Sequence, residues 1–282
     1  MNKTNIVLLG AGGKIGFRVA SRLATHPDFN LHAVEPSPAG RQRLEATGIP
    51  TVAPETAVPH ADVVVFAVPD RHIAMIAEHW VPQMRSGALA ICLDPAAAYA
   101  GVLPPREDIG WFVTHPCHPP LFGVENTPEE RSDWFGGEHA AQSIVCALIQ
   151  GSEAHFSLGE TIGNIAFAPI LRSHRITLEH MALLEPGLVE STSLALLSAI
   201  RDALDRTIAL GVPEDAARDF LLGHLRVELG IVLGLADVTI SDGARMAMED
   251  AKKRILPEGW LDRVITTDAV RDQVRRITGS TN

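Results

Sequence analysis

Two histidines and a cysteine lie within four residues in the segment Thr114-His115-Pro116-Cys117-His118-Pro119-Pro120, which directly follows an apolar run. The prolines restrict the backbone, so less entropy is lost when the imidazoles are held in place. An imidazole at the end of a strand can take the proton of a substrate hydroxyl or bind a metal ion. His115 is therefore predicted to be a catalytic residue or a metal ligand, and His118 a second catalytic residue.

Cys117 lies between these imidazoles, which is the setting of an activated nucleophile. The neighbouring prolines leave little local helix dipole that could stabilise a thiolate. The sequence therefore favours a spectator thiol, with a thiol-dependent aldehyde dehydrogenase as an alternative.

A second chemistry-bearing stretch is Leu171–Gly187. Glu185 follows apolar residues and precedes Pro186-Gly187, which interrupts the helical pattern. A carboxylate on an apolar face needs a cation, a metal ion or a substrate hydroxyl as its partner. Glu185 is predicted to be catalytic and to share a metal ion with His115; the alternative is an exposed acid at a helix end. The cations and the histidine upstream are predicted to bind the anionic group of the substrate: Arg172, His174 and Arg175.

The opening of the chain must position this chemistry. An apolar run, residues 5–9, meets four glycines, Gly10, Gly12, Gly13 and Gly16, with Lys14 and Ile15 between them, and a helical pattern follows. Glycines allow a tight turn with positive φ and leave bare N–H groups that a pyrophosphate can approach at a helix N-terminus. These six residues are predicted to bind a dinucleotide.

A second apolar run ends in Glu35, nineteen residues beyond Gly16. This is where the dinucleotide fingerprint expects an acid that hydrogen-bonds the ribose hydroxyls. Since a carboxylate repels a 2′-phosphate, NAD is favoured over NADP. Because Arg41 follows closely, NADP remains the alternative cofactor.

Further apolar, β-branched strands alternate with helical patterns as far as residue 114, which predicts an α/β domain with a Rossmann-type doubly wound sheet. In such sheets the ligand crosses the carboxyl ends of the strands. The loops after Val68, Leu93 and Thr114 should therefore face the cofactor or the substrate. Val68, Pro69 and Asp70 are predicted to contact the cofactor.

Strand patterns end near Thr177, and leucine-rich helical patterns follow, so an all-α C-terminal domain is expected after the Rossmann-type sheet. We predict a domain at 1–175, with an extension at 121–175 that includes a functional loop, and a helical substrate or dimerisation domain at 176–282. Apolar residues surround these helices, which predicts a homodimer through the helical domain.

Composition narrows the function classes. The chain of 282 residues is 46% hydrophobic and carries a net charge of −10, which argues against nucleic acid or an anionic membrane as the partner. No apolar stretch is expected to reach the roughly 18 residues of a membrane helix. Three cysteines and an N-terminus that runs straight into the first strand suggest a soluble cytoplasmic protein.

Several long motifs are spread over the chain: Val-Pro-Asp at 68–70, His-Pro-Cys-His-Pro-Pro at 115–120, Phe-Gly-Gly at 135–137, Cys-Ala-Leu-Ile-Gln-Gly at 146–151, Arg-Ser-His-Arg at 172–175, Met-Ala-Leu-Leu-Glu-Pro-Gly-Leu at 181–188 and Ala-Arg-Asp-Phe-Leu-Leu-Gly-His at 217–224. With these motifs the chain resembles the D-apionate oxidoisomerase family.

The resemblance implies an NAD-dependent oxidation of a branched sugar acid at the hydroxyl beside its carboxylate, followed by migration of a carbon substituent to give 3-oxo-isoapionate. One divalent metal ion would polarise the new carbonyl. A ketol-acid reductoisomerase places a second acid four residues before its metal-binding glutamate, where this chain has Met181, so a two-metal site is not expected. The alternatives are a plain dehydrogenase of the 6-phosphogluconate or 3-hydroxyacid type and a non-catalytic NAD-sensing module.

Overall fold

The computed structural model describes residues 3–123 and 125–279 and divides into two compact units, Met1–Glu185 with Arg271–Asn282 and Pro186–Val270. The division falls ten residues later than the expected boundary after residue 175. The reason is that helix α8 (Leu178–Ala182) buries Met181 and Ala182 completely, with Met181 in the core on one face of the sheet. The first unit also takes the end of the chain, which the sequence assigned to the helical half.

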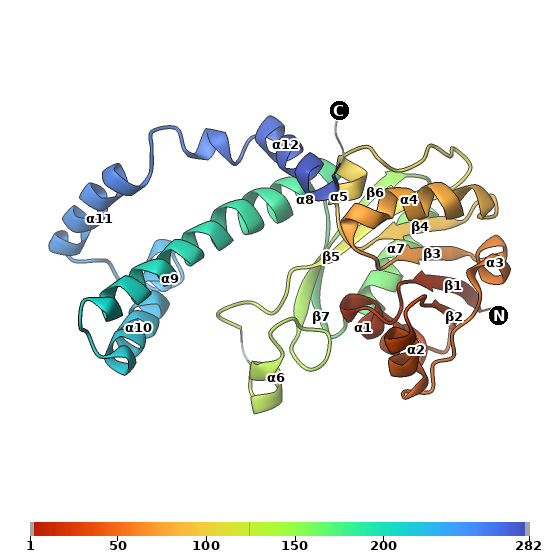
Figure 1. The fold of residues 1–282 in the computed structure, drawn as a ribbon, viewed down its shortest axis with the longest axis horizontal. Coiled ribbons are helices and arrows are strands. Elements are labelled where there is room, and N and C mark those ends of the chain that lie inside the picture. The colour runs from red at the N-terminus through yellow and green to blue at the C-terminus, as the bar shows by residue number, and fades with distance from the viewer. Residues whose placement is uncertain (1–2, 124, 280–282) are drawn as a thin grey trace. The chain divides into compact units, whose positions relative to one another are not determined.

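The first unit is built on one seven-stranded sheet (Figure 1) with the order β2-β1-β3-β4-β5-β6-β7. The strands are β1 (Thr4–Leu9), β2 (Phe29–Val34), β3 (Val63–Phe66), β4 (Leu89–Cys92), β5 (Gly110–Pro116), β6 (Gln142–Gln150) and β7 (Ile170–Arg175). The first five are parallel, β6 runs antiparallel to β5, and β7 is parallel to β6. The predicted Rossmann-type sheet is confirmed, and the chain reverses its direction across the sheet between β2 and β3.

Two apolar cores cover the two faces of this sheet. Helices α1 (Lys14–Leu23) and α7 (Glu153–Ala166) contribute to one core, with Leu23 and Ile162 buried. Helices α4 (Asp70–Trp80) and α8 contribute to the other, with Ile73 and Met181 buried. Because both faces are covered, strands such as β3 are buried along their whole length. The shorter helices of this unit are α2 (Pro38–Glu45), α3 (Pro54–Ala57) and α5 (Ala96–Tyr99).

The excursion between β5 and β6 contains the short helix α6 (Pro128–Ser132) and is organised by the carboxylate of Asp133. This carboxylate accepts hydrogen bonds from the backbone N–H groups of Glu138, His139 and Ala140 at 2.9–3.1 Å. Burial would raise the pKa of Asp133, but the three N–H groups and the guanidinium of Arg18 outweigh it and hold the pKa below its usual value.

Asp133→Asn is therefore expected to lower the free energy of unfolding at pH 7 by about 1–3 kcal/mol, because hydrogen bonds to an ionised acceptor are replaced by weaker ones. A folded-state pKa below the unfolded value of about 3.9 means that the contribution is complete above that value and is lost as the pH falls through the folded pKa. The measurement is chemical denaturation between pH 3 and pH 7. Equal stability of both proteins at pH 7 would contradict the prediction.

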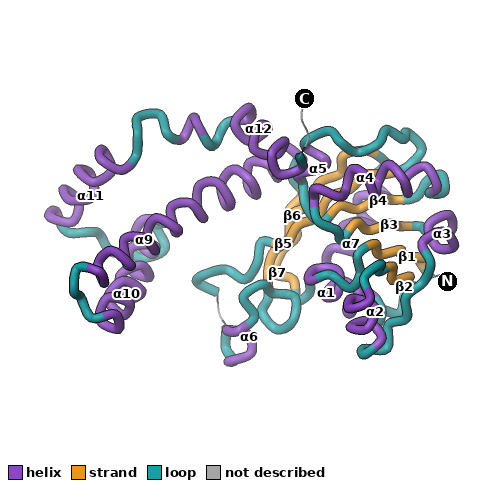
Figure 2. The backbone as a smooth tube through the Cα atoms, viewed as in Figure 1, coloured by secondary structure: helices purple, strands orange, loops and turns teal. Residues whose placement is uncertain are grey.

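The second unit is helical, as predicted, and begins within a π-helix, Leu183–Ser193. It continues through α9 (Leu194–Ala209), α10 (Glu214–Val232), α11 (Asp242–Ile255) and the start of α12 (Thr267–Thr278), and Figure 2 shows α9 and α10 as consecutive helices joined by a short loop. Many of its apolar side chains are exposed, among them Leu194, Phe220 and Val232. Burying such side chains needs a further surface.

One helical segment, Leu178–Ala209, is long and apolar enough to cross a membrane by length and composition alone. The prediction that no stretch reaches this length is therefore wrong. The helices of soluble protein cores pass the same criterion, so the segment does not by itself define a membrane protein.

Candidate active site

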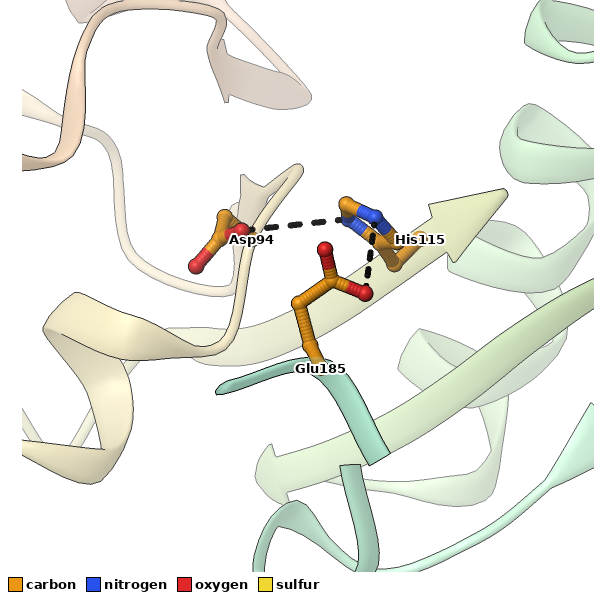
Figure 3. A group of neighbouring side chains, drawn as sticks. All are labelled: Asp94, His115 and Glu185. Carbon is orange, nitrogen blue, oxygen red and sulfur yellow. Dashed lines mark ion pairs between the residues drawn. The ribbon is translucent and has the colours of Figure 1, made fainter. Parts of the chain in front are cut away.

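Three side chains from separate parts of the first unit meet at the carboxyl end of the sheet. Asp94 follows β4, His115 is the sixth residue of β5, and Glu185 lies near the start of the π-helix (Figure 3). His115 Nε2 lies 3.4 Å from Glu185 Oε2, and His115 Nδ1 lies 3.9 Å from Asp94 Oδ2. The structure thus brings together two of the three predicted catalytic residues, His115 and Glu185, and adds a second carboxylate, Asp94.

The backbone determines which nitrogen of His115 is available. Nδ1 lies 2.8 Å from the carbonyl oxygen of Leu93. Since a carbonyl only accepts hydrogen bonds, Nδ1 carries a proton and donates it. Nε2 is then the nitrogen that faces Glu185, and it either binds a proton or offers its lone pair.

The two carboxylates control the charge of His115. Burial would lower the pKa of His115, but the hydrogen bond and charge of Glu185, with the charge of Asp94 and the Leu93 carbonyl, raise it to about 9. Burial would raise the pKa of Glu185. The hydrogen bond and charge of His115, together with the charge of His118, outweigh this effect and lower the pKa of Glu185. Burial raises the pKa of Asp94, and the charge of His115 offsets part of this increase. The raised pKa of His115 and the lowered pKa of Glu185 favour an imidazolium beside the Glu185 carboxylate.

The same three groups suit a divalent cation. One ligand atom each from Asp94, His115 and Glu185 lies within 4.8 Å of the others. Two carboxylates would balance the two positive charges, and carboxylate oxygens with one imidazole nitrogen form a donor set used by several divalent metals. The residues present therefore fit one ion.

His118 is held beside this cluster by a strained backbone. Its φ is +61°, a backbone conformation that residues other than glycine rarely adopt. Its Nδ1 donates to the carbonyl oxygen of Phe135 at 2.9 Å, and its ring centroid lies 6.3 Å from that of His115. Such strain persists where the surroundings enforce it, often at functional sites.

A cavity of about 280 Å³ connects the glycine turn to the cluster. It is lined by residues that the sequence assigned to the cofactor and by two members of the cluster: Gly13, Lys14, Ile15, Val68, Pro69, Asp70, Asp94 and His115. These residues lie at or just after the carboxyl ends of the parallel strands, which is where an α/β sheet binds its ligand.

The turn that precedes this cavity requires glycine. Gly10 has φ +81°, and a Cβ there would lie 2.5 Å from the Ala67 carbonyl oxygen. A Cβ on Gly12 would lie 2.5 Å from the Cα of Gly40. Gly16 is buried in α1, and a Cβ there would overlap the backbone of Gly10. The carboxylate of Glu35 accepts from Gly12 N at 2.8 Å and from Ser37 N at 2.9 Å, at the end of β2 as predicted. The Arg41 guanidinium donates to the carbonyls of Glu35 and Pro36.

The three residues predicted to bind substrate are separated by the alternation of side chains between the two faces of β7. Arg175 is not brought to the cluster: it pairs with Glu153 at 2.6 and 2.7 Å and lies over the Phe156 ring. Arg175 pairs with Cys146, which pairs with Thr114, so its side chain lies on the opposite face of the sheet from that of His115. His174 pairs with Val145, which pairs with His115. His174 and Arg172, both exposed, therefore share the face of His115.

Asp94 is the member of the cluster that the sequence did not assign. Its position directly after the fourth strand, in a loop expected to face the ligand, was the signal available. Cys117 is exposed as a residue, but neighbouring atoms partly desolvate its sulfur, and this desolvation and the charge of Glu185 raise the pKa of its thiol. A raised pKa disfavours the thiolate that nucleophilic catalysis needs.

Known proteins match this chain over nearly all of its length. The family model described as phosphogluconate dehydrogenase (decarboxylating) C-term matches residues 123–278, and the one described as NADP oxidoreductase, coenzyme F420-dependent, matches residues 5–93. D-apionate oxidoisomerases from Cupriavidus necator and Rhizobium rhizogenes are 44% and 42% identical, and each match covers 98% of this chain and 100% of the relative. A semialdehyde dehydrogenase NAD-binding protein from Cupriavidus necator, solved in complex with calcium and NAD, is 44% identical with a TM-score of 0.95, covering 98% and 100% of the two chains.

The Rossmann-type sheet, the glycine turn and the cluster beside the cavity define an oxidoreductase of the NAD-dependent dehydrogenase class. The matches to these relatives extend through both units, and the matched part of the chain contains the cluster. The chain belongs to the D-apionate oxidoisomerase family.

Proposed function

We propose that this protein is an NAD-dependent oxidoisomerase of a branched sugar acid, converting a D-apionate-type substrate into a 3-oxo-isoapionate-type product. The observation that carries the proposal is the position of His115, which lines the cofactor cavity and contacts Glu185 at 3.4 Å. The relatives that bear this activity in their names match both units of the chain.

The reaction has two stages. In the first, the hydroxyl beside the carboxylate loses a hydride from carbon and a proton from oxygen. In the second, a carbon substituent moves from the neighbouring tertiary carbon to the new carbonyl carbon, the tertiary hydroxyl becomes a ketone, and the former carbonyl oxygen gains a proton. NAD when bound would supply the hydride acceptor. The carbon migration changes no oxidation level overall, so the protein needs only to move protons.

His115 and Glu185 can move both protons. The pKa of Glu185 is lowered, so its carboxylate is ionised and can accept the proton of the substrate hydroxyl. His115, held by the Leu93 carbonyl, can donate its Nε2 proton to the carbonyl oxygen on which negative charge grows as the carbon substituent arrives. His118, beside Phe135, is the third proton-carrying group at this site. A divalent cation bound by Asp94, His115 and Glu185 would supply positive charge in place of the His115 proton.

The proposal is tested by incubating the protein with NAD and branched or linear aldonates. The expected result is formation of NADH, seen by its absorbance, together with a product whose carbon connectivity, read by carbon-13 NMR, differs from that of the substrate. NADH with an unchanged carbon skeleton would support a plain hydroxy-acid dehydrogenase instead. No NADH with any sugar acid would support an NAD-sensing module.

Metal dependence is expected in the same assay. A chelator should lower turnover, and Mg²⁺, Mn²⁺ or Ca²⁺ should restore it, because two carboxylates and an imidazole within 4.8 Å form a suitable ligand set. The affinity for NAD should not change, which fluorescence titration of NADH measures. Turnover that is unaffected by chelator would mean that the protonated His115 acts without a metal ion.

We also propose that the protein is a cytoplasmic homodimer that associates through its helical unit. Exposed apolar side chains on α9 and α10, such as Leu194 and Phe220, support an association surface. The three cysteines are unpaired, as in a reducing compartment. The net charge of −10 supports a small-molecule substrate over nucleic acid. Light scattering on the purified protein would test the dimer.

A further inference from the structure

A second cavity, of about 220 Å³, adjoins the cofactor cavity. The two cavities share Lys14, Ile15 and His115, and the second one also reaches His118, Phe135 and Glu185. It therefore opens on the groups that would move protons. Arg172, His174 and Arg175 are not among the described residues that line it, so the acid group of a substrate bound there needs another cation.

Lys14 occupies an unfavourable position for a cation. It is the first residue of α1, and the first turn of this helix carries no acidic side chain. Because a helix N-terminus carries a partial positive charge, an ammonium group there is destabilised unless an anion lies nearby. The position of Lys14 therefore points to an anionic ligand.

The direction of the Lys14 side chain indicates which ligand. Its Nζ lies 3.8 Å from the centroid of the Phe135 ring. Phe135 lines the second cavity and is not among the described residues that line the cofactor cavity. The ammonium group thus lies at the second cavity, whereas the glycine N–H groups remain at the start of α1 for a pyrophosphate.

Other charges leave this role to Lys14. Arg18 also borders the second cavity, but its guanidinium donates to the Gly136 carbonyl at 3.2 Å and lies 3.6 Å from Glu138. Among the described residues, no acidic side chain forms an ion pair with Lys14. Glu185 lines the same cavity, so a bound carboxylate would be repelled unless a cation offset that charge.

Gln142 forms part of the wall of this cavity and is held in place by the backbone. Gln142 is 1% exposed, and its Nε2 donates to the Phe167 carbonyl oxygen at 2.9 Å. Its Oε1 has no hydrogen-bond partner within the part of the chain that the structure describes.

We propose that Lys14 binds the carboxylate of the substrate in this second cavity and does not primarily hold the cofactor pyrophosphate. The identity of the acid as an aldonate rests on the proposed function. In this arrangement the carboxylate lies near Phe135, and the adjacent hydroxyl is directed to His115 and Glu185. The phenyl ring of Phe135 limits the motion of the ammonium group through a cation–π contact.

The test compares Lys14→Met, Lys14→Arg and the wild type, with Lys3→Met as a control that removes an exposed lysine elsewhere on the same unit. NADH affinity is measured by fluorescence titration. Binding of a branched aldonate to the NADH-loaded protein is then measured by calorimetry, in the presence of Mg²⁺, since this complex cannot turn over.

Lys14→Met is expected to weaken aldonate binding by about 10- to 100-fold, as for the loss of a charge-assisted hydrogen bond. Its NADH affinity should change by less than about threefold, well within the effect of one weak contact. Lys14→Arg should recover most of the aldonate binding, and Lys3→Met should match the wild type. The corresponding neutral aldonamide should bind Lys14→Met and wild type alike.

Unchanged aldonate binding in Lys14→Met would overturn the inference, and so would a loss of NADH affinity as large as the loss of aldonate affinity. These outcomes are separable from failure of the proposed function. If the wild type rearranges the carbon skeleton while Lys14→Met binds the acid normally, only the inference fails. If binding of the acid depends on Lys14 but the product keeps the carbon skeleton of the substrate, the inference about Lys14 stands and only the proposed rearrangement fails.

Discussion

Replacing His115 by asparagine is expected to lower kcat by about 10²- to 10⁴-fold, the usual contribution of a positioned acid–base group. Asparagine is the informative substitution because its amide N–H can still donate to the Leu93 carbonyl, as Nδ1 of His115 does. What is lost is the second nitrogen, Nε2, which faces Glu185. Turnover is measured as NADH formation with a saturating branched aldonate.

NAD binding should survive this substitution, because it leaves Gly13 of the glycine turn and the Glu35 carboxylate, which accepts from Gly12 N, unchanged. Cys117→Ser is the matched control: it lies two residues further along the chain, directly after β5, and the raised pKa of its thiol disfavours the thiolate that nucleophilic chemistry needs. It should retain wild-type turnover. Loss of activity in Cys117→Ser with normal activity in His115→Asn would reverse the assignment and favour a thiol-dependent aldehyde dehydrogenase.

Glu185→Gln is expected to reduce kcat by a similar factor of about 10²–10⁴. The substitution keeps the volume of the side chain but removes the charge that accepts a proton and takes part in the metal site. It should also change His115, since Glu185 supplies the main interactions that raise the pKa of that imidazole. With burial then dominant, the His115 pKa should fall well below about 9.

The His115 pKa is read from the imidazole signals in an NMR titration of the wild type and of Glu185→Gln, both without metal ion. Glu78→Gln provides the control, because it makes the same charge change at an exposed position of α4. It should leave both kcat and the titration of His115 unchanged. Wild-type turnover in Glu185→Gln would remove this residue from the mechanism, whatever the outcome for His115.

Local sequence patterns were sufficient for much of the first unit. The apolar run, glycines and helix at residues 4–23 form β1, the turn and α1 because a tight turn and a helix start depend on neighbouring residues. The carboxyl-end rule then predicted that the loops after β3, β4 and β5 converge, and the cavity between them confirms that convergence.

The interactions that the sequence did not predict depend on how distant segments pair. A strand pattern encodes neither direction nor register, so the reversal at β6 and the position of Arg175 on the opposite face of the sheet from His115 were not visible. The π-helix that carries Glu185 combines Pro186, which has no N–H to donate, with packing of the preceding α8 against the sheet. Asp94 directly follows an apolar run, residues 88–93, but its approach to His115 depends on the pairing of β4 with β5.

The anchoring of Glu35 has a consequence for engineering the coenzyme preference. Its carboxylate is tied to two main-chain amides, Gly12 N and Ser37 N, and so cannot swing aside to admit a bulky anion. Arg41, the cation that the sequence offers for binding such an anion, already donates to carbonyl oxygens of the β2–α2 loop. A redesign for the phosphorylated dinucleotide would therefore have to rebuild this whole loop, since adding one basic side chain would leave the obstructing carboxylate in place.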